Sequence, residues 1–265
     1  MPVVKSKMSM DNAMTIKAQI EERDINMQNN LASMIKEKKL FLLDIDGTCC
    51  ELGSKLLPGA ADFLQTVKEN GGIFRFLTNN SSKAASDYVE QFHGWGIETT
   101  EEEFITAGTY ARDFMKKYYG NEKILVAATE TYCSELRKAG LNITDQAGDD
   151  VDCVLCAYDT ELTYEKLVQV CKQLTETKVP WFATNPDLRC PIDFGMVPDC
   201  GSICRMITAS VGREPEYIGK PAPRNGIRLS GRKQDVPPKQ TLLIGDRIYT
   251  DMECGNAQEL TVVWY

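Results

Sequence analysis

The chain has 265 residues, which is enough for one large domain or two smaller ones with a substantial core. Hydrophobic residues make up 43% and charged residues 26%, as in ordinary soluble globular proteins, and no apolar run is long enough to span a membrane. The formal net charge of −8 argues against nucleic acid as the main partner, because phosphate backbones select basic surfaces.

The cysteine pattern indicates a reducing compartment. Ten cysteines are scattered along the chain, and the first residues show no apolar segment typical of a secretory signal. Cys153 and Cys156 form a Cys-x-x-Cys motif on a predicted strand, where this spacing sends the two sulfur atoms to opposite faces. Since His93 is the single histidine, we expect core thiols in a cytoplasmic protein and no zinc site.

Residues 1–37 form a polar, methionine-rich N-terminal extension to which we assign no chemistry. Leu31, Met34 and Ile35 follow an i, i+3, i+4 pattern, which predicts a short amphipathic helix leading into the first strand.

The first strand carries the most informative pattern of the chain. Leu40–Leu43 is a continuous apolar run, typical of a parallel strand that is buried on both faces. Asp44 and Asp46 follow it, and side chains two residues apart on an extended chain point the same way. Because ligands bind at the carboxyl ends of such strands, the two acids predict a metal-assisted reaction site.

The next segment predicts a turn or hairpin, a helix over Ala60–Glu69 and a second strand over 73–77. That strand is followed by Thr78, Asn79, Asn80, Ser81 and Ser82. Short polar side chains at a strand end, with a helix N-terminus at Ser81 and Ser82, can hold a phosphate. A plain helix N-cap is the alternative.

Residues 84–216 repeat the alternation of strands and helices. Thr100 and Glu103 form a capping box for a helix that reaches Tyr118. Further strands are predicted over 123–128, 151–157 and 181–184, with helices over 130–139 and 164–175 and after Gly201 and Ser202. The segment is long enough for a second α/β domain inserted into the first.

The alternation resumes after the insert. A short strand from Tyr217 ends at Lys220, and a helix is predicted over 224–229. Another apolar strand then ends at Asp246, followed by a helix over 251–258 and a final strand over 261–265. The chain is therefore predicted to be an α/β protein, with a core domain of residues 38–83 and 217–265 and an inserted domain of residues 84–216.

Four strand ends thus carry polar groups suited to phosphoryl transfer. In chain order they are Asp44 and Asp46, Thr78 and Asn79, Lys220, and Asp246 and Asp251. A carboxylate can attack phosphorus, a second acid can protonate the leaving oxygen, and further carboxylates can hold Mg²⁺. A lysine and a hydroxyl can stabilise the transferring group. Two plainer readings remain: Lys220 could be a surface lysine, and Asp251 could only cap its helix.

The order of these motifs resembles the haloacid dehalogenase (HAD) superfamily of phosphohydrolases. Further segments resemble its NagD-like, 4-nitrophenylphosphatase branch: Leu-Pro-Gly-Ala at 57–60, Thr-Asn-Asn-Ser at 78–81, Ala-Thr-Asn-Pro-Asp at 183–187, Gly-Lys-Pro at 219–221 and Gly-Asp-Arg-x-x-Thr-Asp at 245–251. The resemblance covers nearly everything from Lys39 onward. It implies a Rossmann-like, HAD-type parallel three-layer core with an inserted α/β cap.

The resemblance also implies roles for the motif residues. Asp44 would be the nucleophile that forms an aspartyl-phosphate, and Asp46 the general acid and then the general base. Thr78 and Asn79 would hold the phosphoryl group, and Lys220 would pair with both the phosphate and the nucleophile.

The implied cofactor is Mg²⁺. Asp44, the backbone carbonyl of Asp46, and Asp246 would hold it, with Asp251 supporting the metal site. By analogy, Asn185, Asp187 and the loop 193–202 would face the leaving group of a small phosphorylated metabolite. A sugar phosphate, a nucleotide, phosphoglycolate, glycerol phosphate and pyridoxal phosphate all remain open, and caps of this branch often meet in homodimers.

The function expected is therefore a Mg²⁺-dependent phosphatase for small phosphate monoesters. A phosphotransferase or phosphomutase is an alternative that keeps the aspartyl-phosphate. A non-catalytic phosphate-binding module is another, because Cys49 and Cys50 follow the first motif in place of the usual apolar or aromatic residues, and the chain ends at Tyr265, where family members usually continue.

Overall fold

The computed structural model describes residues 33, 35–51, 55–192, 194–221 and 236–264. Residues 39–265 form one compact unit, separate from residues 1–38. The helix expected around Leu31 and Met34 lies largely outside the described residues, and the helix expected over 224–229 lies entirely outside them.

The first sheet has five parallel strands in the order β14-β13-β1-β4-β5. Their bounds are Leu40–Leu43 for β1, Ile73–Thr78 for β4, Phe104–Thr106 for β5, Thr241–Gly245 for β13 and Thr261–Trp264 for β14. All four residues of β1 are buried, as their continuous apolar run predicts. Because β1 lies between β13 and β4, the carboxyl ends of these three strands are neighbours.

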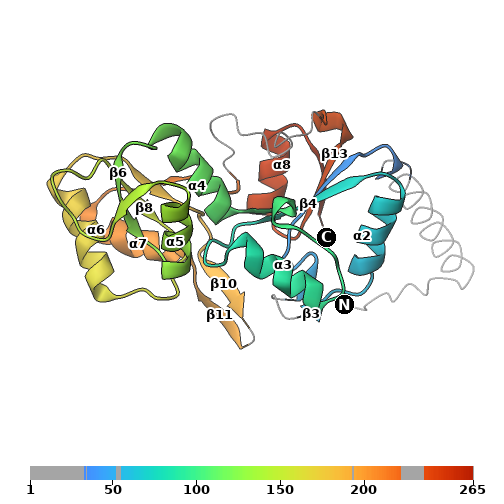
Figure 1. Cartoon of the computed structure of the whole chain (residues 1–265), viewed down its shortest axis with the longest axis horizontal. Coiled ribbons are helices and arrows are strands. Elements are labelled where there is room, and N and C mark those ends of the chain that lie inside the picture. The colour runs from blue at the N-terminus through green and yellow to red at the C-terminus, as the bar shows by residue number, and fades with distance from the viewer. Residues whose placement is uncertain (1–32, 34, 52–54, 193, 222–235, 265) are drawn as a thin grey trace, which may run out of the picture. The chain divides into compact units, whose positions relative to one another are not determined.

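Helices cover both faces of this sheet, with α2 at Ala60–Glu69, α3 at Ala85–Gly94 and α8 at Glu253–Ala257 (Figure 1). Phe41 of β1 packs on Phe63 of α2, with ring centroids 5.8 Å apart. Leu42, the next residue of β1, belongs to the same core cluster as Cys254 of α8. Since neighbouring residues of a strand point to opposite faces, α2 and α8 lie on opposite sides of the sheet. This is the predicted three-layer arrangement.

The second sheet also has five parallel strands, in the order β12-β9-β8-β6-β7. Its strands are β6 (Lys123–Ala127), β7 (Asn142–Thr144), β8 (Cys153–Cys156), β9 (Trp181–Ala183) and β12 (Glu216–Tyr217). Its helices are α4 (Ala107–Tyr118), α5 (Glu130–Lys138), α6 (Tyr164–Glu176) and α7 (Cys200–Val211).

Alternate strand residues of the second sheet enter different cores. Cys153 packs in the cluster that contains Leu136 of α5, whereas Cys156 packs in the cluster that contains Leu174 of α6. The two thiols of the Cys-x-x-Cys motif therefore lie on opposite faces of the sheet, as their spacing predicts.

Two strands lie in a different sheet from the one their position in the sequence suggested. The strand β5 falls within the expected insert of residues 84–216, yet it pairs with β4 of the first sheet. The strand β12, which begins the expected return to the core, pairs with β9 of the second sheet. The chain therefore passes between the sheets after Thr106 and after Tyr217.

The helix predicted from the Thr100 and Glu103 capping box begins later than expected. The capping box does form, but it starts the single 3₁₀ turn η1 at Glu101–Glu103. Strand β5 follows, because Phe104 stacks on Phe76 of β4 with ring centroids 4.9 Å apart. Helix α4 starts only after Thr106, whose hydroxyl accepts a hydrogen bond from the Thr109 amide.

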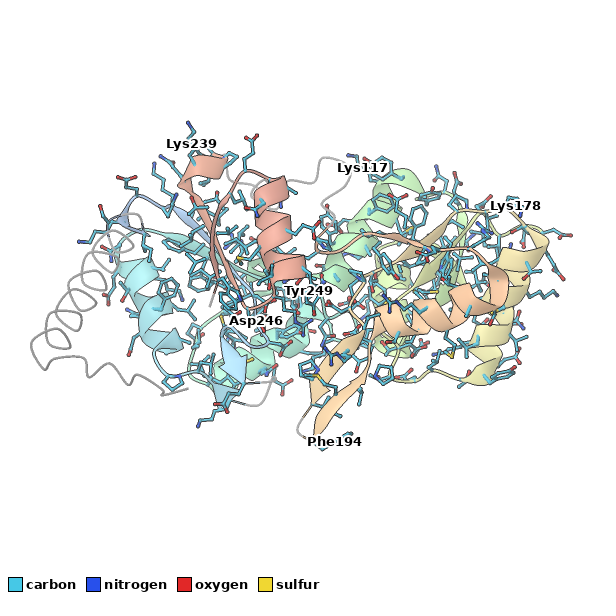
Figure 2. The ribbon with its side chains drawn as sticks, turned by 180° about the vertical axis from the view of Figure 1, so that it is seen from behind. Lys117, Lys178, Phe194, Lys239, Asp246 and Tyr249 are labelled. Carbon is cyan, nitrogen blue, oxygen red and sulfur yellow. The ribbon has the colours of Figure 1, made fainter. Side chains whose placement is uncertain are left out.

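Two antiparallel hairpins complete the described fold. Strands β2 (Cys50–Glu51) and β3 (Lys55–Leu56) form the hairpin expected after the first strand. Strands β10 (Arg189–Ile192) and β11 (Gly195–Pro198) form a hairpin that the sequence did not indicate. Phe194 lies at its tip and is 84% exposed (Figure 2). Among the described residues, none of the helices combines the length and apolar character that a membrane span requires.

Candidate active site

The candidate site lies where β1, β4 and β13 end. Strand β1 stops at Leu43, and the Asp44 amide continues its pairing with β13 by donating to the Ile244 carbonyl at 2.9 Å. Asp44 is only 8% exposed, so its carboxyl group is held inside the protein. Asp246 directly follows β13, and Thr78 ends β4.

Lys220 bonds directly to Asp44. Its Nζ atom donates to Asp44 Oδ1 at 2.7 Å, to Asp251 Oδ1 at 2.5 Å and to the Leu77 carbonyl at 3.0 Å. An ammonium group has three N–H donors, so each of them has an acceptor here. Lys220 is 6% exposed, which excludes the alternative reading of a surface lysine.

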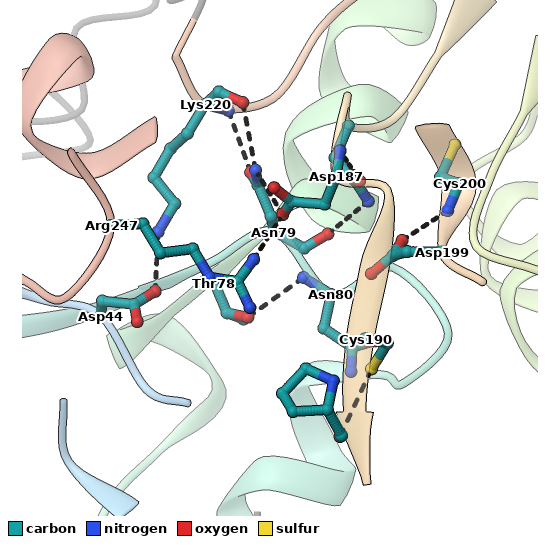
Figure 3. A network of polar contacts seen from close by, with 12 residues as sticks. Asp44, Thr78, Asn79, Asn80, Asp187, Cys190, Asp199, Cys200, Lys220 and Arg247 are labelled. Carbon is teal, nitrogen blue, oxygen red and sulfur yellow. Dashed lines mark hydrogen bonds and ion pairs between the residues drawn. The ribbon is translucent and has the colours of Figure 1, made fainter. Parts of the chain in front are cut away.

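The main chain of Lys220 is held by Asn79 (Figure 3). The Lys220 amide donates to Asn79 Oδ1 at 3.0 Å, and Asn79 Nδ2 donates to the Lys220 carbonyl at 3.1 Å. Lys220 follows a strand of the second sheet, β12, and not a strand end of the first sheet as expected. Its contact with Asp44 therefore depends on the segment that returns from the second sheet.

Burial changes the acidity of the charged groups. Burial raises the pKa of Asp44 from 3.8 to about 7, although the neighbouring Lys220 opposes the shift. Burial also raises the pKa of Asp46 and of Asp246. For Lys220 burial would lower the pKa, but the charges of Asp251 and Asp44 outweigh it and raise the pKa. Ionising all of these acids together is therefore unfavourable without a cation.

Three carboxylates are arranged to hold a metal ion. One oxygen atom each from Asp44, Asp246 and Asp251 lies within 4.8 Å of the others. Asp246 Oδ1 is buried and has no hydrogen-bond partner within the described part of the chain, whereas Asp251 Oδ2 also accepts from the Arg247 amide at 3.1 Å. Asp251 thus both caps its turn and pairs with Lys220. Carboxylate oxygens are the ligands that Mg²⁺ prefers, so this set fits the expected metal.

The side chain of Asp46 lies apart from this carboxylate set. Among the described residues, the candidate metal group does not include it. Its Oδ1 atom instead accepts a weak hydrogen bond from Cys50 Sγ at 3.8 Å. The family resemblance implies that the backbone carbonyl of Asp46 contacts the metal and that its carboxyl group transfers the proton.

The polar residues 78–81 at the end of β4 either line the cleft or bond to the end of β9. Thr78 and Asn80 line the cleft, and the Asn80 amide donates to Thr78 Oγ1 at 3.0 Å. Ser81 is fully buried and bonds to Thr184 Oγ1 at 2.8 Å, so it connects to the end of β9. The prediction that a helix starts at Ser81 and Ser82 is wrong, because α3 begins at Ala85.

One cleft is lined by most of the predicted site residues. Six of them line it: Asp44, Asp46, Thr78, Asn79, Asp187 and Lys220. Asn80, Cys190, Pro191, Asp199, Arg247 and Thr250 complete the lining. Asp246 and Asp251 approach Asp44 from outside this lining, and Asn185 does not line the cleft.

Asn185 and Asp187 were expected to face the leaving group, but of the two only Asp187 lines the cleft. Asn185 is fully buried: its Nδ2 donates to the Asn79 carbonyl at 2.7 Å, and its Oδ1 accepts from the Asp187 amide at 3.0 Å. Asp187 Oδ2 accepts from Asn79 Nδ2 at 3.1 Å and pairs with an Arg247 nitrogen at 3.2 Å. These contacts correct the expected orientation of Asn185.

Sequence reasoning gave no role to Arg247, and it included Asp199 only as part of the loop 193–202 that was expected to face the leaving group. Arg247 directly follows Asp246 in the last motif, and this position beside a strand-end acid was a signal that could have been used. Asp199 caps α7 by accepting from the Cys200 amide, and burial raises its pKa to about 7. Asp199 lines the cleft, and residues 195–202 of the expected loop form strand β11 and the first turn of α7.

Comparisons with known proteins identify the family and the fold of the chain. A family model described as haloacid dehalogenase-like hydrolase matches residues 41–142, and a HAD-hydrolase-like model matches residues 217–265. The 4-nitrophenylphosphatase from Thermotoga maritima has a similar solved structure, with a TM-score of 0.80, 36% identity and coverage of 87% of both chains.

Two related sequences have similar coverage. The 5'-nucleotidase YutF of Bacillus subtilis is 29% identical over 83% of this chain and 84% of its own length. An acid sugar phosphatase of Staphylococcus epidermidis is 27% identical over 83% of both. With its motif residues gathered at the strand ends of a three-layer parallel core, the chain belongs to the haloacid dehalogenase-like hydrolase family, in its NagD and 4-nitrophenylphosphatase branch.

Proposed function

We propose that this hydrolase removes the phosphoryl group from small phosphate monoesters in a Mg²⁺-dependent reaction. One observation carries the proposal: the buried carboxyl group of Asp44 lies 2.7 Å from the Lys220 ammonium and within 4.8 Å of two further carboxylates. Phosphoryl transfer needs a positioned nucleophile and positive charge around the transferring group. The cleft offers both at one point.

Asp44, Asp246 and the backbone carbonyl of Asp46 would hold Mg²⁺, with Asp251 supporting the site. The buried, unpartnered Asp246 Oδ1 and the raised pKa of Asp246 support a cation there. When bound, the metal would offset the negative charge of the phosphoryl oxygens. Lys220 would add a fixed positive charge on the side of Asp44.

The side chains divide the reaction between them. An oxygen of Asp44 attacks phosphorus, and the bond from phosphorus to the leaving oxygen breaks while Asp46 donates a proton to that oxygen. Asp46 then accepts a proton from a water molecule, which attacks the aspartyl-phosphate and releases inorganic phosphate. Burial raises the pKa of Asp46, which supports its role as the initial proton donor.

The substrate is proposed to be a small phosphorylated metabolite. The names of the relatives point to nucleotides and sugar phosphates, and both classes are phosphate monoesters. Thr78 would contact the phosphoryl group from the end of β4. The ten free cysteines support a reducing compartment, so we place the reaction in the cytoplasm.

The test measures phosphate release from 4-nitrophenyl phosphate and from a panel of sugar phosphates and nucleotides, with Mg²⁺ and with EDTA. We expect turnover only with the metal, and turnover below detection for Asp44→Asn, because an amide is a poor nucleophile. Substantial activity of a correctly folded Asp44→Asn variant would sink the assignment. A product that carries the phosphate on a second alcohol, without free phosphate, would indicate the phosphotransferase alternative.

A further inference from the structure

Five residues beside the cleft form a closed ring of hydrogen bonds and ion pairs. Figure 3 shows four of them, Asn79, Asp187, Lys220 and Arg247. Lys220 Nζ donates to Asp251 Oδ1, and Asp251 Oδ2 accepts from the Arg247 amide. The Arg247 guanidinium pairs with Asp187 Oδ2 at 3.2 Å, and Asp187 Oδ2 also accepts from Asn79 Nδ2 at 3.1 Å. The Lys220 amide, which donates to Asn79 Oδ1 at 3.0 Å, closes the ring.

The members of the ring come from four separate parts of the chain. Asn79 follows β4, Asp187 follows β9, Lys220 follows β12, and both Arg247 and Asp251 follow β13. Strands β4 and β13 belong to the first sheet and β9 and β12 to the second. The ion pair between Asp187 and Arg247 is the step that joins a segment after β9 to the turn that carries Asp251.

The contacts of Asn79 and Asp187 favour a positioning role over a substrate contact. Both N–H donors of the Asn79 amide are directed to protein acceptors, the Lys220 carbonyl and Asp187 Oδ2. Asp187 is 3% exposed; its Oδ2 atom already has two partners, whereas its Oδ1 atom has no hydrogen-bond partner among the described residues. Arg247 is the most exposed member, with 23% of its side chain accessible.

We propose that Asp187 and Arg247 are positioning residues, whose ion pair closes the ring that holds Lys220 against Asp44. This inference rests on the proposed phosphatase function, because it assigns Lys220 a place beside the nucleophile. A charge that is fixed in advance stabilises a transition state without reorganisation, and small displacements of such a group reduce the rate strongly. Cutting the ring at the ion pair therefore lowers kcat more than it raises KM.

The experiment compares Asp187→Asn, Arg247→Gln and the double variant. The amide oxygen that Asp187→Asn introduces can still accept from Asn79, and the Arg247 backbone amide still reaches Asp251, so each single variant removes mainly the ion pair. We expect kcat for 4-nitrophenyl phosphate to fall about 10-fold or more in each single variant, with KM changed less than about 3-fold. The double variant should lose no more than the worse single variant, because both substitutions cut one link.

The leaving group provides the second readout. A positioning role predicts the same fold-loss of kcat with 4-nitrophenyl phosphate and with glycerol 3-phosphate. Two outcomes would overturn the inference: fold-losses of kcat that multiply in the double variant, or a change of KM that differs between the two substrates. Either one would show that Asp187 and Arg247 contact the substrate separately.

Two further variants separate positioning from loss of stability. Arg213→Gln removes a guanidinium that donates to three backbone carbonyls at and just after the end of α6, and its kcat should equal that of the unmodified protein. If Asp187→Asn does not fold, Arg247→Lys keeps the charge but changes its reach. An intermediate kcat at unchanged KM is then expected, and an unchanged kcat contradicts the inference. Phosphate release by the unmodified protein, and its loss in Asp44→Asn, test the proposed function independently.

Discussion

At the scale of single residues, glycines let the carboxylates of the site pack against the backbone. Gly47 has a φ of +95°, and a Cβ atom on it would lie 2.5 Å from Asp246 Oδ2. A Cβ atom on Gly245 would similarly overlap the carboxyl group of Asp251. Both glycines are therefore required by the close approach of the acids, and Gly47 also by the left-handed backbone of its turn.

Gly47→Ala should displace Asp246 and weaken the metal site. We expect the Mg²⁺ concentration for half-maximal activity to rise about 10-fold, because a carboxylate at a proposed ligand position is shifted. Gly59→Ala is the matched control: Gly59 has a φ of +84°, but a Cβ atom there would meet nothing within 4 Å. Both variants should lose roughly 1–2 kcal/mol of stability. Equal Mg²⁺ requirements in the two variants would contradict this account of Gly47.

At the scale of the elements, Arg213 holds the C-terminal end of α6. It follows α7 and donates to the Leu174 carbonyl at 2.9 Å, the Thr177 carbonyl at 3.1 Å and the Val179 carbonyl at 2.6 Å. The last carbonyls of a helix have no partner within it, and a positive charge at that end is favourable. One side chain thus fixes α6 to the segment leading into β9.

Arg213→Gln should reduce stability without changing catalysis. Hydrogen bonds from a charged donor contribute about 1.5–3 kcal/mol each, so we expect the free energy of unfolding to fall by roughly 2 kcal/mol or more. Urea denaturation followed by circular dichroism measures this change. A variant with unchanged stability would show that water replaces the guanidinium at these carbonyls.

At the scale of the whole molecule, we expect the buried carboxyl groups to make stability depend on pH and on metal. Burial raises the pKa of both Asp44 and Asp199 from 3.8 to about 7. The folded protein therefore holds these protons more tightly than the unfolded chain does. The resulting stabilisation is complete below about pH 4 and is lost as the pH rises through about 7.

The metal-free protein should therefore become less stable between about pH 5 and about pH 7.5. Each of the two carboxyl groups contributes at most roughly 4 kcal/mol to the full change, at about 1.4 kcal/mol per pKa unit. Asp199→Asn, which can still cap α7, should reduce the pH dependence. Measuring the free energy of unfolding in EDTA at several pH values tests this pH dependence. A free energy of unfolding that rises steadily over the same pH range in both the unmodified protein and Asp199→Asn would contradict the prediction.

Adding Mg²⁺ at about pH 7.5 should restore stability, because the metal binds the ionised carboxylates. The gain is about 2.7 kcal/mol at a Mg²⁺ concentration about 100 times its Kd. Asp246→Asn should reduce this gain, and an equal gain in that variant would show that the metal binds elsewhere.

Local patterns predicted most of the elements. The helix Ala60–Glu69 and the strand Leu40–Leu43 have the predicted bounds, because each has one periodicity bounded by clear stop signals. The capping box at Thr100 led to the wrong prediction that a long helix starts there. A capping box specifies only one turn, and the packing of Phe104 on Phe76 decides that a strand follows. The hairpin β10–β11 was missed because Pro191 and Pro198 interrupt any strand pattern.

The sequence by itself determined the fold class and the order of the chemical groups, since apolar periodicity and acids at strand ends are local features. The tertiary structure alone decided their contacts. It showed that Lys220 reaches Asp44 from a segment after the second sheet, that Asn185 faces inward, and that Arg247 pairs with Asp187. These contacts join residues that lie far apart in the sequence, and such pairings depend on how the two sheets bring their strand ends together, which no local pattern encodes.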